Sequence, residues 1–334
     1  MDHQRLLMRA GAAVIAFAII LRLIGGGFFA PLGQFLESPG LWSFLVYLQT
    51  GRAVRLPPEM EAPPPETTLP DDPTLPSEDT EVFLPVFSPG DMQNIEVMYG
   101  CSYRPDLGAL LQQKLQWDLT GQGPKVLIVH THATESYTRS PGESYQEEVA
   151  YRTLDEHYNM VSIGDEVARV LEAGGIGVIH DRTYHDHPSY NDAYVNARNA
   201  VARYLAQYPS IELVLDIHRD AAGGENGTQL KTHGTVGGQP SSQLMVVVGT
   251  DASGNHHPNW QTNLALGLKL TAVLERADPG LTRPISLRSE RFNMDLTPGS
   301  LLIEIGAAGD THDEAMLAAN ALARGILTLA RGTS

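Results

Sequence analysis

Residues 125–130 read Lys-Val-Leu-Ile-Val-His, and this stretch decides the fold of the chain. The apolar run from Val126 to Val129 is led in by Gly121-Gln122-Gly123-Pro124 and ends at His130. A short, continuous apolar run bounded by turn residues predicts a strand buried on both faces, as in a parallel sheet. The polar segment of residues 131–137 follows at once. Such a strand end is where open α/β sheets place their ligand sites.

Strands and helices alternate along the chain after this first strand. Apolar runs predict further strands at residues 178–179, 211–217, 244–248 and 301–305. Amphipathic spacing predicts helices at residues 106–117, 160–173, 194–208, 263–275 and 311–330. The alternation favours an α/β domain with a mostly parallel central sheet flanked by helices.

Three regions differ in composition. Residues 1–50 contain the apolar stretch 10–30, which is long enough to span a bilayer and is interrupted by Arg22. Arg5 and Arg9 precede it and favour a cytoplasmic N-terminus, although a cleaved signal peptide is the alternative. Residues 51–81 are rich in Pro, Glu, Asp and Thr, which predicts an extended linker. Residues 82–334 carry the expected folded domain.

Charge and cysteine content narrow the classes of function. The 334-residue chain has a net charge of −16, whereas a nucleic-acid partner would require a basic face. Cys101 is the single cysteine, which excludes an internal disulfide and a zinc cluster made of thiolates. An acidic, membrane-tethered enzyme or receptor fits this composition.

Polar residues lie at or next to the ends of four predicted strands. They are His130, His180, His218 and Glu304. Two or three imidazoles with a carboxylate are the donors of a catalytic zinc site, in which the metal activates water. Glu304 lies within Leu301–Gly306, and so apolar a run favours a raised pKa and a general acid–base role. The alternative is structural, because some of twelve histidines will fall at strand ends by chance.

Several long motifs then match a known family. They are residues 130–137 (HTHATESY), 175–190 (GIGVIHDRTYHDHPSY), 216–221 (DIHRDA) and 295–306 (DLTPGSLLIEIG). In this order they closely resemble the stage II sporulation protein P family, from about Phe83 to the C-terminus. The N-terminal anchor and linker resemble the layout of that family as well.

The resemblance implies a bacterial cell-wall hydrolase on the outer side of the cytoplasmic membrane. It implies a zinc-dependent N-acetylmuramoyl-L-alanine amidase with a zinc amidase-like fold, and an endopeptidase activity on peptide cross-links is also attributed to the family. It further implies a role in engulfment during sporulation, with stage II sporulation proteins D and M as partners.

The resemblance also assigns roles to residues. His130 and His218 match the imidazole ligands of zinc, and Glu304 matches the catalytic carboxylate. Glu135 is the first choice for the third ligand because it lies just past His130, and His132 is the second choice.

Further residues are assigned less directly. Arg219 and Asp220 adjoin His218, and Asp220 is a candidate for fixing an imidazole tautomer unless it pairs with Arg219. Arg198 is a candidate for binding a substrate carboxylate, and His180 is interpreted as structural.

Three other functions stay open from the sequence. One is a degenerate amidase domain that binds wall glycan without cleaving it. Another is a zinc peptidase whose main reaction is cross-link cleavage, because sequence does not separate amide bonds within one polymer. The third is a membrane-tethered adaptor in which the histidines are structural.

Overall fold

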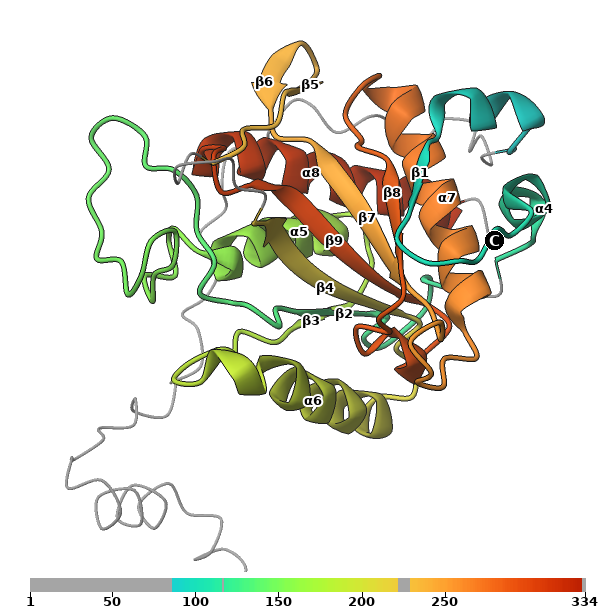
Figure 1. Ribbon diagram of the computed structural model, residues 1–334, viewed down its shortest axis with the longest axis horizontal. Coiled ribbons are helices and arrows are strands. Elements are labelled where there is room, and N and C mark those ends of the chain that lie inside the picture. Colours follow the sequence, from blue (N-terminus) through green and yellow to red (C-terminus); the bar gives the residue numbers. More distant parts are fainter. Residues whose placement is uncertain (1–85, 116, 222–228, 332–334) are drawn as a thin grey trace, which may run out of the picture. The chain divides into compact units, whose positions relative to one another are not determined.

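The computed structural model describes residues 86–115, 117–221 and 229–331. Their centre is a seven-stranded sheet of order β1-β8-β7-β9-β4-β2-β3 (Figure 1). Neighbouring strands run parallel except β7 and β9, which pair antiparallel. The strands are β1 (Val97–Tyr99), β2 (Val126–Val129), β3 (Val178–His180), β4 (Leu213–Asp220), β7 (Leu244–Gly249), β8 (Ile285–Arg288) and β9 (Ser300–Ala307). A separate hairpin pairs β5 (Gly234–Val236) with β6 (Gln239–Ser241).

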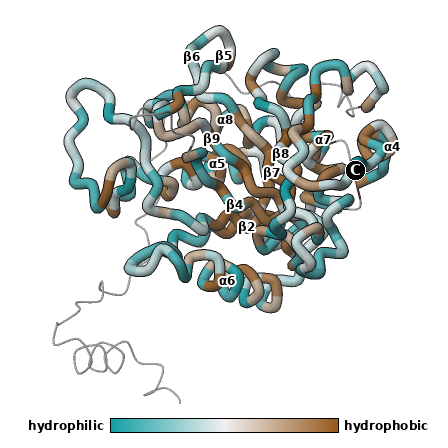
Figure 2. Tube along the Cα trace, viewed as in Figure 1, coloured by the Kyte–Doolittle hydropathy of each residue, from teal (hydrophilic) through white to brown (hydrophobic). Residues whose placement is uncertain are grey.

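Helices cover both faces of the sheet. Helices α5, α7 and α8 share one apolar cluster with Ile128, Leu215 and Ile303, and α6 packs on Leu127 and Val129 of the opposite face (Figure 1). The strands between these layers are the most hydrophobic part of the described chain (Figure 2). The helices are α4 (Leu107–Gln112), α5 (Met160–Ala173), α6 (Ala193–Gln207), α7 (Trp260–Ala277) and α8 (His312–Arg331), with short 3₁₀ turns η1 (Pro89–Asn94), η2 (Tyr190–Asp192) and η4 (Met294–Leu296).

The predicted α/β fold with a mostly parallel sheet is confirmed. Helix α5 spans the predicted residues, because the Asn159 side chain caps its first turn by accepting a hydrogen bond from Val161 N, and Gly174 ends it. Helix α4 is shorter than predicted and ends at Gln112. Strands β1 and β8 were not predicted from the sequence.

The predicted anchor at residues 10–30 and the linker at residues 51–81 lie outside the described residues. Within the described ranges, no helix combines the length and hydropathy needed to cross a membrane. All elements of the sheet and its helices fall within the domain predicted at residues 82–334.

The carboxyl ends of strands β2, β3, β4 and β9 lie at the same edge of the sheet, because these strands run parallel. Their side chains divide between two faces, because successive residues of a strand point to opposite sides. Ile128 packs against α5, and His130, two residues further on, is directed to that same face. Val214 and Leu302 lie on the opposite face, which places His218 and Glu304 there.

His130 forms a buried pair with His180 beneath α5. The two Nε2 atoms are 2.8 Å apart, and Nδ1 of His130 lies 2.9 Å from the carbonyl oxygen of Ile217. Nδ1 of His180 lies 3.0 Å from Oδ1 of Asp165. Gly164 of α5 leaves room for the pair, since a Cβ there would lie 2.4 Å from Nε2 of His180 and 2.5 Å from Nε2 of His130. This glycine therefore lets α5 approach the sheet edge.

The Gly164→Ala variant is expected to lower the free energy of unfolding by about 1–3 kcal/mol, because two packed imidazoles must move. Gly108→Ala in α4 is the matched control, since its Cβ would meet nothing closer than Oδ1 of Asp106 at 3.5 Å. That control should be neutral or gain up to about 1 kcal/mol from helix propensity. Chemical denaturation measures both; equal stability of the two variants would contradict a tight histidine pair.

Candidate active site

The loop after β2 holds one carboxylate beside each of two histidines. The backbone N and Oγ1 of Thr131 donate to Asp216 at 2.8 and 2.6 Å. Oδ1 of Asp216 lies 2.9 Å from Nε2 of His218. Burial opposes a charge on His218, but the carboxylates of Asp216, Glu135 and Glu304 outweigh it and raise the pKa of His218 to about 10. Asp216 therefore orients and polarises this imidazole.

The second carboxylate is Asp186, and it lies beside His132. Oγ1 of Thr134 donates to Oδ2 of Asp186 at 2.5 Å, and that oxygen lies 3.9 Å from Nδ1 of His132. Burial, with the positive charges of His218 and Arg152, lowers the pKa of His132 to about 3. The rings of His132 and His218 meet edge to face, with centroids 5.4 Å apart. His132 is thus a neutral imidazole next to a charged one.

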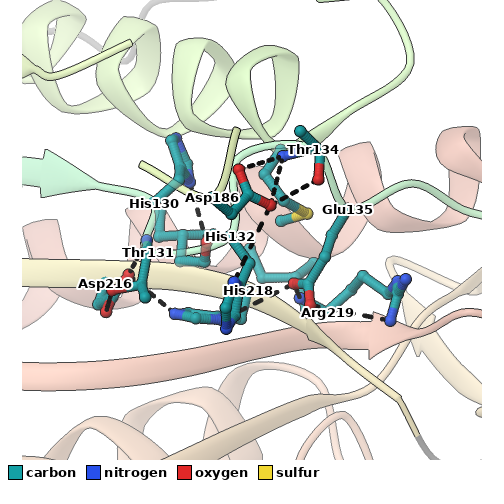
Figure 3. Close-up of polar contacts among 12 residues, drawn as sticks. His130, Thr131, His132, Thr134, Glu135, Asp186, Asp216, His218 and Arg219 are labelled. Atoms are coloured by element: carbon teal, nitrogen blue, oxygen red, sulfur yellow. Dashed lines mark hydrogen bonds and ion pairs between the residues drawn. The ribbon is translucent and has the colours of Figure 1, made fainter. Parts of the chain in front are cut away.

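Glu135 completes this group of side chains (Figure 3). Its Oε2 lies 3.7 Å from Nδ1 of His218 and accepts a hydrogen bond from the backbone N of Arg219 at 3.2 Å. The Arg219 side chain donates to the carbonyl oxygens of Ser136 and Tyr151 at 2.9 and 2.8 Å. These contacts fix the glutamate carboxylate on the side of His218 that faces away from Asp216.

Arg152 joins the two halves of the site. Its Nη1 donates to Oδ2 of Asp186 at 2.9 Å, and its Nη2 donates to Oε1 of Glu135 at 3.3 Å. Its guanidinium also lies 4.6 Å from the ring centroid of Tyr190, whose ring stacks on His132 at 4.5 Å. One cation from the segment between β2 and α5 therefore neutralises two buried carboxylates at once.

Glu304 lies beside His218 on the neighbouring strand, because the β4–β9 register pairs these two residues. Burial raises the pKa of Glu304 to about 8; the carboxylates of Glu135 and Asp220 act in the same direction, and the charge of His218 acts against them. Its Oε2 is buried without a hydrogen-bond partner among the described residues. A carboxyl group that gains and loses a proton near neutral pH suits general acid–base chemistry.

The donor set of His132, Glu135 and His218 fits zinc chemically once His218 gives up one of its two ring protons, because a metal ion binds only the neutral imidazole. Two imidazoles and a carboxylate form a common catalytic ligand set, and metal-binding histidines present their second ring nitrogen to a carboxylate. Asp216 occupies that position beside His218, whereas Asp186 lies 3.9 Å from Nδ1 of His132, beyond hydrogen-bond distance. Within the described ranges, no three His, Cys, Asp or Glu side chains stand at metal-binding spacing. The three donors would have to draw closer together to share one ion.

Comparison with known proteins identifies the family. A family model described as stage II sporulation protein P (SpoIIP) matches residues 78–327, which is most of the chain. The chain belongs to the stage II sporulation protein P family. Stage II sporulation protein P of Bacillus subtilis (strain 168) is 27% identical over 215 residues, covering 61% of this chain and 50% of that relative. The chain thus spans about half the length of this family member.

Solved structures of amidases are also similar to this chain. N-acetylmuramoyl-L-alanine amidase AmiC2 of Nostoc punctiforme has 14% sequence identity and a TM-score of 0.37, covering 62% of this chain and 97% of the amidase. The CwlD amidase of Clostridioides difficile, solved in complex with the GerS lipoprotein, has 12% identity and a TM-score of 0.38, covering 60% of this chain and 96% of the amidase.

The family's ligand positions are not all brought together. Glu135 lies beside His218, whereas His130 is directed away from both (Figure 3). Both ring nitrogens of His130 are engaged within the protein, by His180 and by Ile217. His132, the second choice from the sequence, is the imidazole that approaches His218.

Two predicted accessory residues have partners within the protein itself. Arg198 makes a bidentate pair with Asp295 at 2.7 and 2.8 Å, so its guanidinium already holds a carboxylate. Asp220 pairs with Arg283 at 2.8 Å rather than with an imidazole or Arg219. Asp216 lies in the orienting position beside His218 instead.

Sequence reasoning missed four residues of the site: Asp216, Asp186, Arg152 and Tyr190. Asp216 carried a usable signal, because it precedes His218 by two residues on a strand and must share its face. Arg152 and Asp186 come from loops and Tyr190 from the short turn η2, where no periodicity indicates which side chains turn toward the sheet.

The Arg152→Ala variant should lower the free energy of unfolding of the metal-free protein by about 3 kcal/mol, because two buried carboxylates lose their cation. The control is Arg169→Ala, which breaks an exposed pair with Glu166 on α5. That loss should stay below about 1 kcal/mol. Urea denaturation decides: similar losses for both variants would show that Arg152 does not neutralise the site.

Proposed function

We propose that this chain is a zinc-dependent peptidoglycan hydrolase that cleaves the amide between N-acetylmuramic acid and L-alanine. The observation that carries the proposal is the group of His132, Glu135 and His218 beside the raised-pKa carboxyl of Glu304. Family membership supports sporulation as the setting and peptidoglycan as the substrate. We propose His132 rather than His130 as the imidazole that binds zinc together with His218.

Each side chain has a distinct task in this proposal. Zinc, when bound, lowers the pKa of water and polarises the scissile carbonyl. Asp216 lies against Nε2 of His218 and so leaves Nδ1 of that ring for a ligand, while stacking on Tyr190 holds the ring of His132. Arg152 donates a hydrogen bond to Oε1 of Glu135 and so holds this side chain in place.

Glu304 performs the proton transfers. Its carboxylate takes the proton from the attacking water, and the same carboxyl then gives that proton to the nitrogen of the leaving amine. The raised pKa makes both steps accessible near neutral pH. The apolar strand around Glu304 keeps this part of the site poor in competing water.

Several finer points stay predictions from the sequence. They are endopeptidase activity on cross-links, partnership with stage II sporulation proteins D and M, and an anchor at residues 10–30 that holds the domain outside the cytoplasmic membrane. Separate experiments on the full-length protein address each of them.

The zinc content of two variants tests whether His132 or His130 binds the metal together with His218. His132→Asn should lose bound zinc, because amides are poor zinc ligands, whereas the matched His130→Asn should retain it. Asparagine keeps a donor near the place of Nδ1 in both variants, so the contact of residue 130 with the carbonyl oxygen of Ile217 can be retained. Metal analysis of the purified proteins measures the outcome; zinc lost only from His130→Asn would overturn our ligand assignment.

Glu304→Gln should reduce hydrolysis by about 10²–10⁴-fold while zinc content stays at the wild-type level. The reason is that glutamine keeps the shape of the side chain but neither takes up nor returns the proton.

Mass analysis of muropeptides from digested cell wall gives the readout. Free stem peptide released by the wild-type protein supports the amidase reaction, and loss of cross-linked dimers alone would indicate an endopeptidase instead. Wild-type turnover in Glu304→Gln would remove Glu304 from the mechanism.

A further inference from the structure

Tyr194, near the start of α6, carries a hydroxyl that the described residues leave unused. Its ring meets His132 edge to face, with centroids 5.6 Å apart and an interplanar angle of 89°. The residue is half-buried, and no hydrogen bond joins its hydroxyl to another described residue. A hydrogen-bond donor is therefore available beside a candidate zinc ligand.

Three carboxylates of the site act on this hydroxyl. Burial raises the pKa of Tyr194 well above its usual range. The negative charges of Asp216, Glu304 and Glu135 raise this pKa further. They come from β4, β9 and the loop after β2, so the hydroxyl is within electrostatic range of all three elements of the site. The phenol thus keeps its proton near neutral pH and acts as a donor rather than as a base.

The backbone that supports Tyr194 is strained. Phe292 and Asn293 come after β8 with φ of 48° and 61°, in the left-handed region that bulky residues rarely adopt. The ring centroid of Phe292 lies 6.0 Å from that of Tyr194, and Nδ2 of Asn293 donates to the carbonyl oxygen of Tyr194 at 2.8 Å. Such strain persists where the surrounding structure holds it, and it is common at functional sites. Both strained residues therefore help to fix Tyr194 beside His132.

We propose that the Tyr194 hydroxyl donates a hydrogen bond to the oxygen of the scissile amide carbonyl. The inference rests on the proposed function and adds a catalytic residue to it. When water adds to the amide carbon, its proton passes to Glu304 and the π electron pair of the carbonyl moves onto the oxygen. That oxygen gains negative charge, so a donor beside it stabilises the transition state more than the bound substrate. The pair returns when the C–N bond breaks and the amine nitrogen takes the proton from Glu304.

The position of Tyr194 suits this task. The scissile carbonyl must lie between the candidate zinc ligands and Glu304, because the former polarise it through the metal and the latter takes the proton of the attacking water. Tyr194 contacts His132 among those ligands, and the charge of Glu304 acts on its hydroxyl. The side chain therefore borders the space that the amide would occupy, and it keeps its own proton throughout.

Tyr194→Phe tests the donor in the full-length protein, because it removes the hydroxyl and keeps the ring. With soluble glycan–peptide fragments, kcat should fall by about 10²-fold, the order expected for one lost oxyanion donor, and KM should change less than about 2-fold. The control is Tyr204→Phe, the same change on the same helix, about 15 Å further along its axis. It should leave both constants unchanged.

Two measurements separate a donor from a ring that only supports His132. The zinc content of Tyr194→Phe should equal that of the wild type, and its loss would reject the catalytic role. Affinity for a phosphinate analogue, in which tetrahedral phosphorus replaces the scissile carbonyl, should fall about as much as kcat. Affinity of the uncleaved fragments for the inactive Glu304→Gln protein should not change when Tyr194→Phe is added. Equal losses for analogue and substrate would show a binding contact alone and overturn the proposal.

Turnover also separates the failure of this inference from the failure of the proposed function. If the wild-type protein releases no stem peptide, the proposed function fails, and the role of Tyr194 fails with it. If the wild-type protein is active and Tyr194→Phe has the same kcat, only the role of Tyr194 is overturned.

Discussion

The site depends on the parallel pairing of β4 with β9, which sets His218 directly beside Glu304. Both side chains lie in a largely buried environment, where a charge is tolerated only with a partner. Against the effect of burial, the carboxylates of Asp216 and Glu135 raise the pKa of His218, whereas burial itself raises the pKa of Glu304, whose Oε2 has no hydrogen-bond partner among the described residues.

Buried carboxylates are neutralised from two directions. Threonines of the loop after β2 donate to Asp216 and Asp186, and Arg152 reaches Asp186 and Glu135 from the segment before α5. The loop and the sheet are therefore coupled electrostatically. Removing one donor takes a hydrogen bond from a buried carboxylate, and the charge of that carboxylate acts on the other carboxylates beside it. It also explains how so acidic a chain buries several carboxylates at one edge of its sheet.

The order of strands and helices could be predicted from the sequence, and so could the edge of the sheet at which the polar residues lie. It was insufficient for the face that each side chain occupies. The run Val126–Val129 is apolar throughout because both faces are covered, so no alternation shows that His130 turns toward α5 while His218 turns away. Contacts made by loops, such as those of Arg152 and Tyr190, depend on tertiary packing that periodicity does not encode.

The one antiparallel pairing in the described sheet, between β7 and β9, divides it into two functional parts. Strands β7, β8 and β1 deliver their carboxyl ends to the edge opposite the candidate active site. The connections that follow β7 and β8 therefore begin at the edge away from the reaction centre. The reaction constrains the sequence at one edge of the sheet. At the opposite edge, residues can vary with the surface that the domain presents to its surroundings.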